Sequence, residues 1–343
     1  MNRKFQVVHV KLSKVDENEA KRLAKITFPF LIMMSADLER FLGSRGLLTT
    51  KYRIAKDSQG FLYAIKNRRN WSNFLITNGR SKTAVTKNIL EAIKGRNAIC
   101  HSNLPLILNN WRVYLNSWVE VCLMIGSSQT ASEIRRGLGA LSQPITNLTV
   151  GLNPTVTAMT IFTNLEIQSN VKTWTAEKEE AYLFLGKIFY DLITDTYSPA
   201  LTDFAIARRH QCPTSVIDCH ELTELIKSKC SASDFHSPHD AACFDVGNLQ
   251  IAADGRHAAV HEQKTNLLAN WDRYLASMMY VTKGIGAMTA AKTIGRARSF
   301  LLLARDRARR SLVTKTSRQK STRPNQKPAA GRSQRLSGGS RRR

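Results

Sequence analysis

Two stretches of this chain repeat each other, and this duplication restricts the possible fold more than any other feature. Residues 95–111 read GRNAICHSNLPLILNNW, and residues 255–271 read GRHAAVHEQKTNLLANW. When the comparison is extended to 95–136 and 255–296 without a gap, 16 of 42 positions are identical at a constant offset of 160 residues. Unrelated segments of this composition would share roughly two or three. The chain is therefore expected to contain one structural unit twice.

Both copies have the spacing of a helix with one buried face. Apolar residues recur at steps of three and four, which is the period of an amphipathic helix. The shared positions include Trp111 and Trp271, Tyr114 and Tyr274, and Leu115 and Leu275. Caps and apolar spacing predict further helices over about 16–42, 83–94, 129–141, 175–197 and 288–305. We therefore expect an all-α fold of two helical bundles in tandem.

Composition changes along the chain give the expected boundaries. A linker is expected between the copies because the segment is rich in Thr and Asn and contains Pro144 and Pro154. From Ser311 to Arg343 the chain has ten Lys or Arg and no acid. Such a segment buries too little apolar surface to fold, so it is expected to be disordered. The predicted order is an N-terminal segment 1–15, a bundle 16–142, a linker 143–173, a bundle 174–306 with an insertion 210–243, and a basic tail 307–343.

The charge of the chain indicates a polyanionic partner. The sequence has 51 Lys and Arg against 26 Asp and Glu, a net charge of +25. Nucleic acid is the expected partner, and an anionic membrane surface is the second candidate. No stretch is long and apolar enough to span a membrane, and no secretory signal is recognisable. Six Cys at irregular spacing favour reduced thiols in a cytoplasmic or nuclear protein. No cofactor is expected, and a homo-oligomer remains open.

Each copy carries an Arg followed five residues later by a His. The pairs are Arg96 with His101 and Arg256 with His261, and they occupy the same place in the repeat. The spacing alone is uninformative, since composition would produce roughly one such pair by chance. The positional agreement is informative. With Asn97 and His257 at the polar position after the Arg, both motifs resemble the signature of the HEPN superfamily.

This resemblance implies a fold and an activity. Many HEPN domains pair across a two-fold axis, so that both Arg-His motifs lie in one cleft that cleaves RNA without a metal. A tandem chain would make this pair within itself, with Arg96, His101, Arg256 and His261 as catalytic residues. The expected products are a 2′,3′-cyclic phosphate and a 5′-hydroxyl. The residue types suit this chemistry, because His exchanges protons near neutral pH and Arg stabilises charge on phosphate oxygens.

Two other readings of the same residues remain open. Many members of the superfamily only bind RNA, so the chain could be an RNA-binding or RNA-packaging protein, similar to a nucleocapsid, with a basic arm. The Arg and His residues could also be purely structural, as helix caps or satisfied core groups. Asn110 and Asn270 precede the repeated Trp and either support the Arg-His pairs or serve as ordinary packing residues.

Two further clusters are candidate binding sites. In YAIKNRRNWSNF, cations lie beside aromatic side chains, which is typical of single-strand binding, although a solvated helix face explains it equally well. The RNA-binding candidates are Lys66, Arg68, Arg69 and Trp71, together with Arg341, Arg342 and Arg343 in the tail. The insertion is rich in zinc-ligand types, but at spacings that favour ordinary thiols in a mobile segment. Its candidate ligands are Cys212, Cys219, His220, Cys230, His236, His239 and Cys243.

Overall fold

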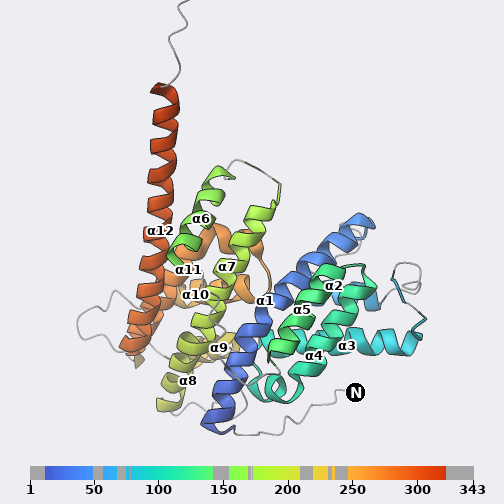
Figure 1. The fold of residues 1–343 in the computed structure, drawn as a ribbon. Coiled ribbons are helices and arrows are strands. Elements are labelled where there is room, and N and C mark those ends of the chain that lie inside the picture. The colour runs from blue at the N-terminus through green and yellow to red at the C-terminus, as the bar shows by residue number, and fades with distance from the viewer. Residues whose placement is uncertain are drawn as a thin grey trace, which may run out of the picture.

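The structure is a computed structural model, and all of its regular elements are helices (Figure 1). It describes residues 12–48, 57–67, 75–77, 79–141, 154–168, 171, 173–208, 219–230, 234–235 and 246–321. The helices are α1 (Lys14–Ser44), α2 (Ser58–Lys66), α3 (Lys82–Cys100), α4 (Leu104–Met124), α5 (Ser128–Leu141), α6 (Pro154–Ile167), α7 (Ala176–Leu192), the π-helix η3 (Ile193–Tyr197), α8 (Ser198–Ala207), α9 (Cys219–Lys229), α10 (Val246–Val260), α11 (Lys264–Gly284) and α12 (Met288–Ser321). The predicted all-α class is confirmed for these residues, and no helix among them is long and apolar enough to cross a bilayer.

The duplicated sequence forms duplicated structure. Helices α3 and α10 end at equivalent residues, and α4 and α11 begin and end at equivalent residues. The turn after the first helix uses a left-handed residue in both copies, Ser102 with φ 51° and Glu262 with φ 59°. Gly126 and Gly286 repeat this at the next turn, with φ values of 82° and 79°. The offset of 160 residues is therefore preserved in the backbone conformation as well as in the side chains.

Gly95 and Gly255 lie inside α3 and α10, although the sequence predicted a helix that ended before Gly95. The helix continues because glycine allows the next helix to pack closely at this position. A Cβ atom on Gly95 would lie 2.6 Å from the Cβ of Tyr114, and one on Gly255 would lie 2.6 Å from the Cβ of Tyr274. Each glycine therefore permits a close crossing of two helices, which positions the end of the first helix.

These crossings predict a stability effect with a matched control. Gly95→Ala and Gly255→Ala are each expected to lower the free energy of unfolding by about 1–3 kcal/mol. The added methyl group would push the helix backbone away from the side chain of Tyr114 or Tyr274. Gly139→Ala, on the exposed face of α5 with no atom within 4 Å of the added carbon, is expected to raise it by about 0.5–1 kcal/mol. Urea unfolding of the three variants measures both the expected losses and the expected gain in the free energy of unfolding. A destabilisation by Gly139→Ala of the same size would contradict this packing argument.

The two halves of the chain share one hydrophobic core. Helix α7 crosses α1 near the middle of the molecule (Figure 1), where the rings of Phe28 and Tyr190 stack with centroids 4.2 Å apart. From α7, the Tyr190 hydroxyl donates to the Ile99 carbonyl at 2.9 Å, and the Tyr182 hydroxyl donates to the Ala259 carbonyl at 3.3 Å. Ile99 and Ala259 are equivalent residues, so α7 holds the ends of both repeated helices.

The segment 143–173 was predicted to be a linker, but its residues 154–167 form helix α6. The linker was predicted because the segment contains Pro144 and Pro154 and is rich in Thr and Asn, which are poor helix formers. In α6, however, Thr160 and Thr163 donate their hydroxyls to carbonyls one turn earlier, and the helix packs on α12 and α7. The Phe162 ring lies 5.5 Å from the ring of Trp271. Burial of α6 against these helices outweighs the low helix propensity.

Two predicted ends of helices were also wrong. Helix α12 was expected to stop near residue 305, and the tail was expected to begin at 307, but α12 reaches Ser321. Its buried residues Ala304 and Ala308 pack into the core, and no Gly or Pro follows Gly295 until Pro324. The remainder of the tail, 322–343, lies outside the described residues. The helix predicted over about 175–197 also continues, through η3 into α8, because Pro199 lies in the first turn of α8, where its missing N–H is not needed.

Candidate functional site

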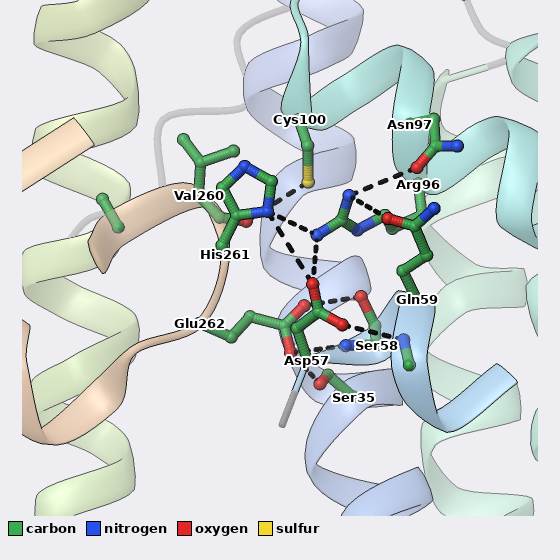
Figure 2. Close-up of polar contacts among 12 residues, drawn as sticks. Ser35, Asp57, Ser58, Gln59, Arg96, Asn97, Cys100, Val260, His261 and Glu262 are labelled. Carbon is green, nitrogen blue, oxygen red and sulfur yellow. Dashed lines mark hydrogen bonds and ion pairs between the residues drawn. The ribbon is translucent and has the colours of Figure 1, made fainter. Parts of the chain in front are cut away.

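The four predicted Arg and His residues come together where α3 and α10 end. The rings of His101 and His261 lie 5.9 Å apart between centroids and are inclined at 71°. His261 contacts a guanidinium of each repeat: its Nδ1 lies 2.9 Å from Arg96 Nη2, and its Nε2 lies 3.1 Å from Arg256 Nη1. Figure 2 shows His261 from one repeat facing Arg96 from the other. One group of side chains is thus built from both copies of the duplication.

Hydrogen bonds between the end of α3 and the end of α10 hold these side chains together. The Arg256 Nη2 donates to the Cys100 carbonyl at 2.9 Å, and the Cys100 thiol donates to the Val260 carbonyl at 3.3 Å. Cys100 and Val260 are equivalent residues, one before each His. The left-handed residue after each His then turns the chain into the next helix. Burial raises the pKa of the Cys100 thiol to about 11, so it remains a neutral donor.

Arg96 is completely buried and its guanidinium is held by three polar groups. Its Nη2 donates to Asp57 Oδ2 at 2.7 Å, and its Nη1 donates to Gln59 Oε1 at 3.1 Å and to Asn97 Oδ1 at 3.2 Å. Among the residues that the structure describes, the Nε atom has no hydrogen-bond partner. Arg256 is 3% exposed. Both guanidinium groups therefore act on their surroundings chiefly through charge and through fixed hydrogen bonds.

Asp57 is a member of the site that sequence analysis missed. It caps the N-terminus of α2, where its Oδ1 accepts from the Gly60 N–H at 2.7 Å. Its Oδ2 lies 3.7 Å from His261 Nδ1. Burial would raise the pKa of Asp57, but the nearby His261 ring, the hydrogen bond from Gly60 and the charge of Arg96 together lower it. The ionised carboxylate favours a proton on Nδ1 of His261, which leaves Nε2 as the acceptor.

A sequence signal for Asp57 exists in retrospect. Residues 57–66 read DSQGFLYAIK and residues 218–227 read DCHELTELIK, with Asp, Ile and Lys at matching positions. These segments run into α2 and α9, and α2 packs on α3 as α9 packs on α10. The duplication therefore extends upstream of the obvious repeat. Its offset there is 161 residues rather than 160, so an ungapped comparison does not reveal it.

His261 has more donors around it than a neutral ring can satisfy. Both ring nitrogens face guanidinium nitrogens, but a neutral imidazole has only one acceptor nitrogen. One of the two contacts therefore brings two donors together. Burial, followed by the charges of Arg96, Arg256 and His257, lowers the pKa of His261 to about 4 despite the opposing effect of Asp57. The ring is thus neutral at physiological pH and lies in a cationic environment.

Glu262, next to His261, is a second buried acid that the sequence did not reveal. Its Oε1 accepts from the Ser58 hydroxyl at 2.6 Å and its Oε2 accepts from the Ser58 N–H at 3.0 Å, while the Ser35 hydroxyl also donates to Oε2. Its partners Ser35 and Ser58 belong to α1 and α2, and Figure 2 shows Glu262 beside Asp57. Burial raises the pKa of Glu262 to about 7, despite hydrogen bonds from both serines and the charge of Arg96. The first repeat has Ser102 at this place, so the two halves of the site differ.

The raised pKa of Glu262 predicts a change of stability with pH. Between about pH 4.5 and 7 the folded chain holds a proton on Glu262 that the unfolded chain has lost, so this group's contribution to stability declines as pH rises through 7. Glu262→Gln has no such proton, and its amide can donate to the Ser58 hydroxyl while its oxygen accepts from the Ser58 N–H. Relative to the wild type, the free energy of unfolding of Glu262→Gln is expected to rise by about 2–3 kcal/mol from pH 5 to pH 8. Denaturant unfolding at both values measures this. A constant difference would contradict a raised pKa.

The other predicted polar residues divide into two groups. Asn97 bonds to Arg96, and the exposed His257 ring lies 4.3 Å from the ring of His261, so both belong to the site. The amides of Asn110 and Asn270 instead donate to the Leu106 and Asn266 carbonyls of their own helices, both at 3.1 Å. They stabilise α4 and α11 and do not contact the Arg-His pairs.

Most of the remaining candidates fall outside the described residues. Lys66 is half-buried at the end of α2, with its ammonium 5.5 Å from the Tyr63 ring centre. Arg68, Arg69, Trp71 and Arg341–Arg343 are not described, nor are Cys212, His236, His239, Cys243 and the side chain of His220. Cys219 is buried in α9 and Cys230 is half-buried just after it. Within the described ranges, no three His, Cys, Asp or Glu side chains cluster so that they could hold a metal ion.

Comparison with known proteins adds no relative. No protein-family model matches the chain, no curated protein is similar to it, and no solved structure resembles it closely enough to count as a match. The geometry of the Arg-His site is therefore the basis on which its chemistry is argued below.

Proposed function

We propose that this chain is a metal-independent endoribonuclease of the HEPN type, in which two helical bundles pair within one chain. The observation that carries the proposal is the meeting of equivalent residues. His101 and His261 lie 5.9 Å apart, and His261 is in contact with the Arg of each repeat. Two copies of an Arg-His motif can act together only if one substrate contacts both of them. A basic tail on a chain with a net charge of +25 suits an RNA substrate.

The proposed reaction is attack of a ribose 2′-oxygen on the adjacent phosphorus. Neutral His261 takes the proton of the 2′-hydroxyl, and the new oxygen–phosphorus bond closes a 2′,3′-cyclic phosphate. The bond from phosphorus to the 5′-oxygen breaks, and the electron pair leaves with that oxygen, which takes a proton from the protonated form of His101. The charges of Arg96 and Arg256 stabilise the negative charge that grows on the phosphate.

The low pKa of His261 changes when substrate binds. A base with a pKa of about 4 is fully deprotonated at neutral pH but has little affinity for a proton. A phosphodiester near the two guanidinium groups offsets part of their charge, which raises the pKa of His261 toward neutral pH. It also supplies an acceptor oxygen for the surplus donors around the ring. Substrate binding therefore strengthens the base where the proton is to be taken.

Cleavage in the presence of a chelator tests the proposal. Purified protein is incubated with labelled single-stranded RNA in excess EDTA, and the fragment ends are identified. The expected fragments end in a 2′,3′-cyclic phosphate and begin with a 5′-hydroxyl, and DNA of the same sequence remains whole because it lacks the attacking hydroxyl. RNA that remains intact would refute catalysis by this site.

A second candidate function is RNA binding or packaging without cleavage. The burial of Arg96 and Arg256 favours it, because a bonded Arg-His group also serves to hold the two halves together. This function predicts RNA affinity that falls steeply with salt, is largely lost when residues 311–343 are deleted, and is unchanged by His101→Ala or His261→Ala. Cleavage that depends on either His would rule it out as the full description.

A further inference from the structure

One helix joins the Arg-His site to a cationic groove at its other end. A shallow groove of about 570 Å³ runs along the N-terminal part of α3. Among the described residues it is lined by Lys82, Thr83, Thr86, Lys87, Leu90, Glu91 and Lys94. The three lysines are exposed, and Lys94 pairs with Glu91 at 2.7 Å while its side chain stays 63% exposed. The groove therefore presents exposed ammonium groups and hydroxyls, which suit phosphate oxygens.

The groove and the site share one face of α3. Residues at steps of three and four lie above one another on a helix. Such a series runs from the groove to the site through Thr83, Lys87, Leu90, Lys94, Asn97 and His101. Lys87 precedes His101 by 14 residues, which corresponds to about 21 Å along the helix axis. A polyanion lying along this face would place one end in the groove and the other at the His101 ring.

The equivalent face of α10 differs in charge. Its matching residues are Gly247, Gln250, Asp254, His257 and His261. Asp254 stands where α3 has Lys94, and it accepts a hydrogen bond from Gln250 at 2.9 Å. No lysine occurs along that stripe of α10. Phosphate is therefore favoured on the α3 side of the site and disfavoured on the α10 side, although the two helices derive from one duplicated unit.

We infer that the α3 face is the track along which single-stranded RNA reaches His101. This inference rests on the proposed function and names the substrate class of the same site. Leu90, between the lysines, is 36% exposed and offers an apolar contact to a base, which a single strand presents and a duplex keeps stacked. In-line attack also needs a flexible backbone, which a single strand provides. Entry is one-sided: the strand approaches over the first repeat.

Binding measurements with matched charge changes test the track. Lys82→Gln, Lys87→Gln and Lys94→Gln are combined in one variant, and the exposed Lys229, Lys283 and Lys292 are changed to Gln in a control with the same net charge. Both variants also carry His261→Ala so that RNA is not cut. Anisotropy of a labelled uridine-rich RNA is measured over a series of KCl concentrations. Loss of three phosphate contacts is expected to reduce the slope of log affinity against log salt by about two. The control is expected to change it by less than half as much.

The outcomes separate the track from the nuclease. Equal losses in both triple variants, or no loss in the α3 variant, would overturn the track whether or not the wild type cuts RNA. Loss confined to the α3 variant supports the track, even if the wild type proves unable to cut. A duplex of the same sequence is expected to be insensitive to the α3 substitutions; an equal effect on the duplex would overturn the assignment of a single strand. In the active background, the α3 variant is expected to raise KM by roughly tenfold with little change in kcat.

Discussion

His261→Ala is expected to slow RNA cleavage by about 10²–10⁴-fold, because the change removes the proposed base for the 2′-hydroxyl proton. Single-turnover rates in EDTA measure the loss. Asn270→Ala, outside the site on α11, serves as the control and is expected to cleave at the wild-type rate. Equal rates for His261→Ala and the wild type would contradict a catalytic role for this imidazole.

The pH dependence of the wild type separates catalysis from a structural role of His261. In the free protein the ring loses its proton at a pKa of about 4, so kcat/KM is expected to remain high down to about pH 5 and to fall near pH 4. Bound phosphate raises this pKa, so the acid limb of kcat is expected at a higher pH than that of kcat/KM. Coincident acid limbs near pH 6.5 would show that the ring is not held in the cationic surroundings described here.

Arg96→Ala is expected to lower the free energy of unfolding by about 3–5 kcal/mol, since it leaves the partly buried Asp57 without its cation and opens a cavity between α2 and α3. Arg136→Ala removes an exposed pair with Glu133 and is expected to cost less than about 1 kcal/mol. The urea midpoints of the two variants, at an unchanged m-value, compare their losses in the free energy of unfolding. A similar small loss in both would mean that the buried guanidinium contributes little to holding the halves together.

The parts of this fold that repeat could be predicted from the sequence. A constant offset and a three-to-four spacing identify α4 and α11, and the shared position of Arg96 with Arg256 and of His101 with His261 identifies the candidate site before any coordinates. Their juxtaposition was a geometric expectation, and the 5.9 Å between the two rings agrees with it. This part was predictable because duplication leaves the same residues at the same places in both copies.

The parts that depend on tertiary contacts could not be predicted. Asp57 reaches Arg96 from 39 residues away and is marked only by a short repeat at a shifted offset. Glu262 meets Ser35 from 227 residues away, and no local pattern marks it. Helix α6 has low intrinsic propensity and forms on the surface of α12. Gly95 looks like a helix end, yet it permits a close crossing with Tyr114. In each case packing between distant segments outweighs the local preference.

The difference between the halves matters for function as much as their similarity. Asp57 lies beside His261, while Glu262, the residue after His261, is bonded to Ser35 and Ser58 and is replaced by Ser102 in the first repeat. The lysines of the α3 face likewise lack counterparts on α10. We therefore expect the duplicated motifs to have diverged, with His261 as the base and the first repeat as the side where RNA enters.

The most direct test of the proposed chemistry uses a DNA oligonucleotide that contains a single ribonucleotide. If a ribose 2′-hydroxyl bound between His101 and His261 is the nucleophile, wild-type protein in EDTA will cut this strand at one place, on the 3′ side of the ribose, and leave a 2′,3′-cyclic phosphate there. A strand that stays whole while all-RNA is degraded, or one that is cut between deoxyribonucleotides, would contradict cleavage by this site.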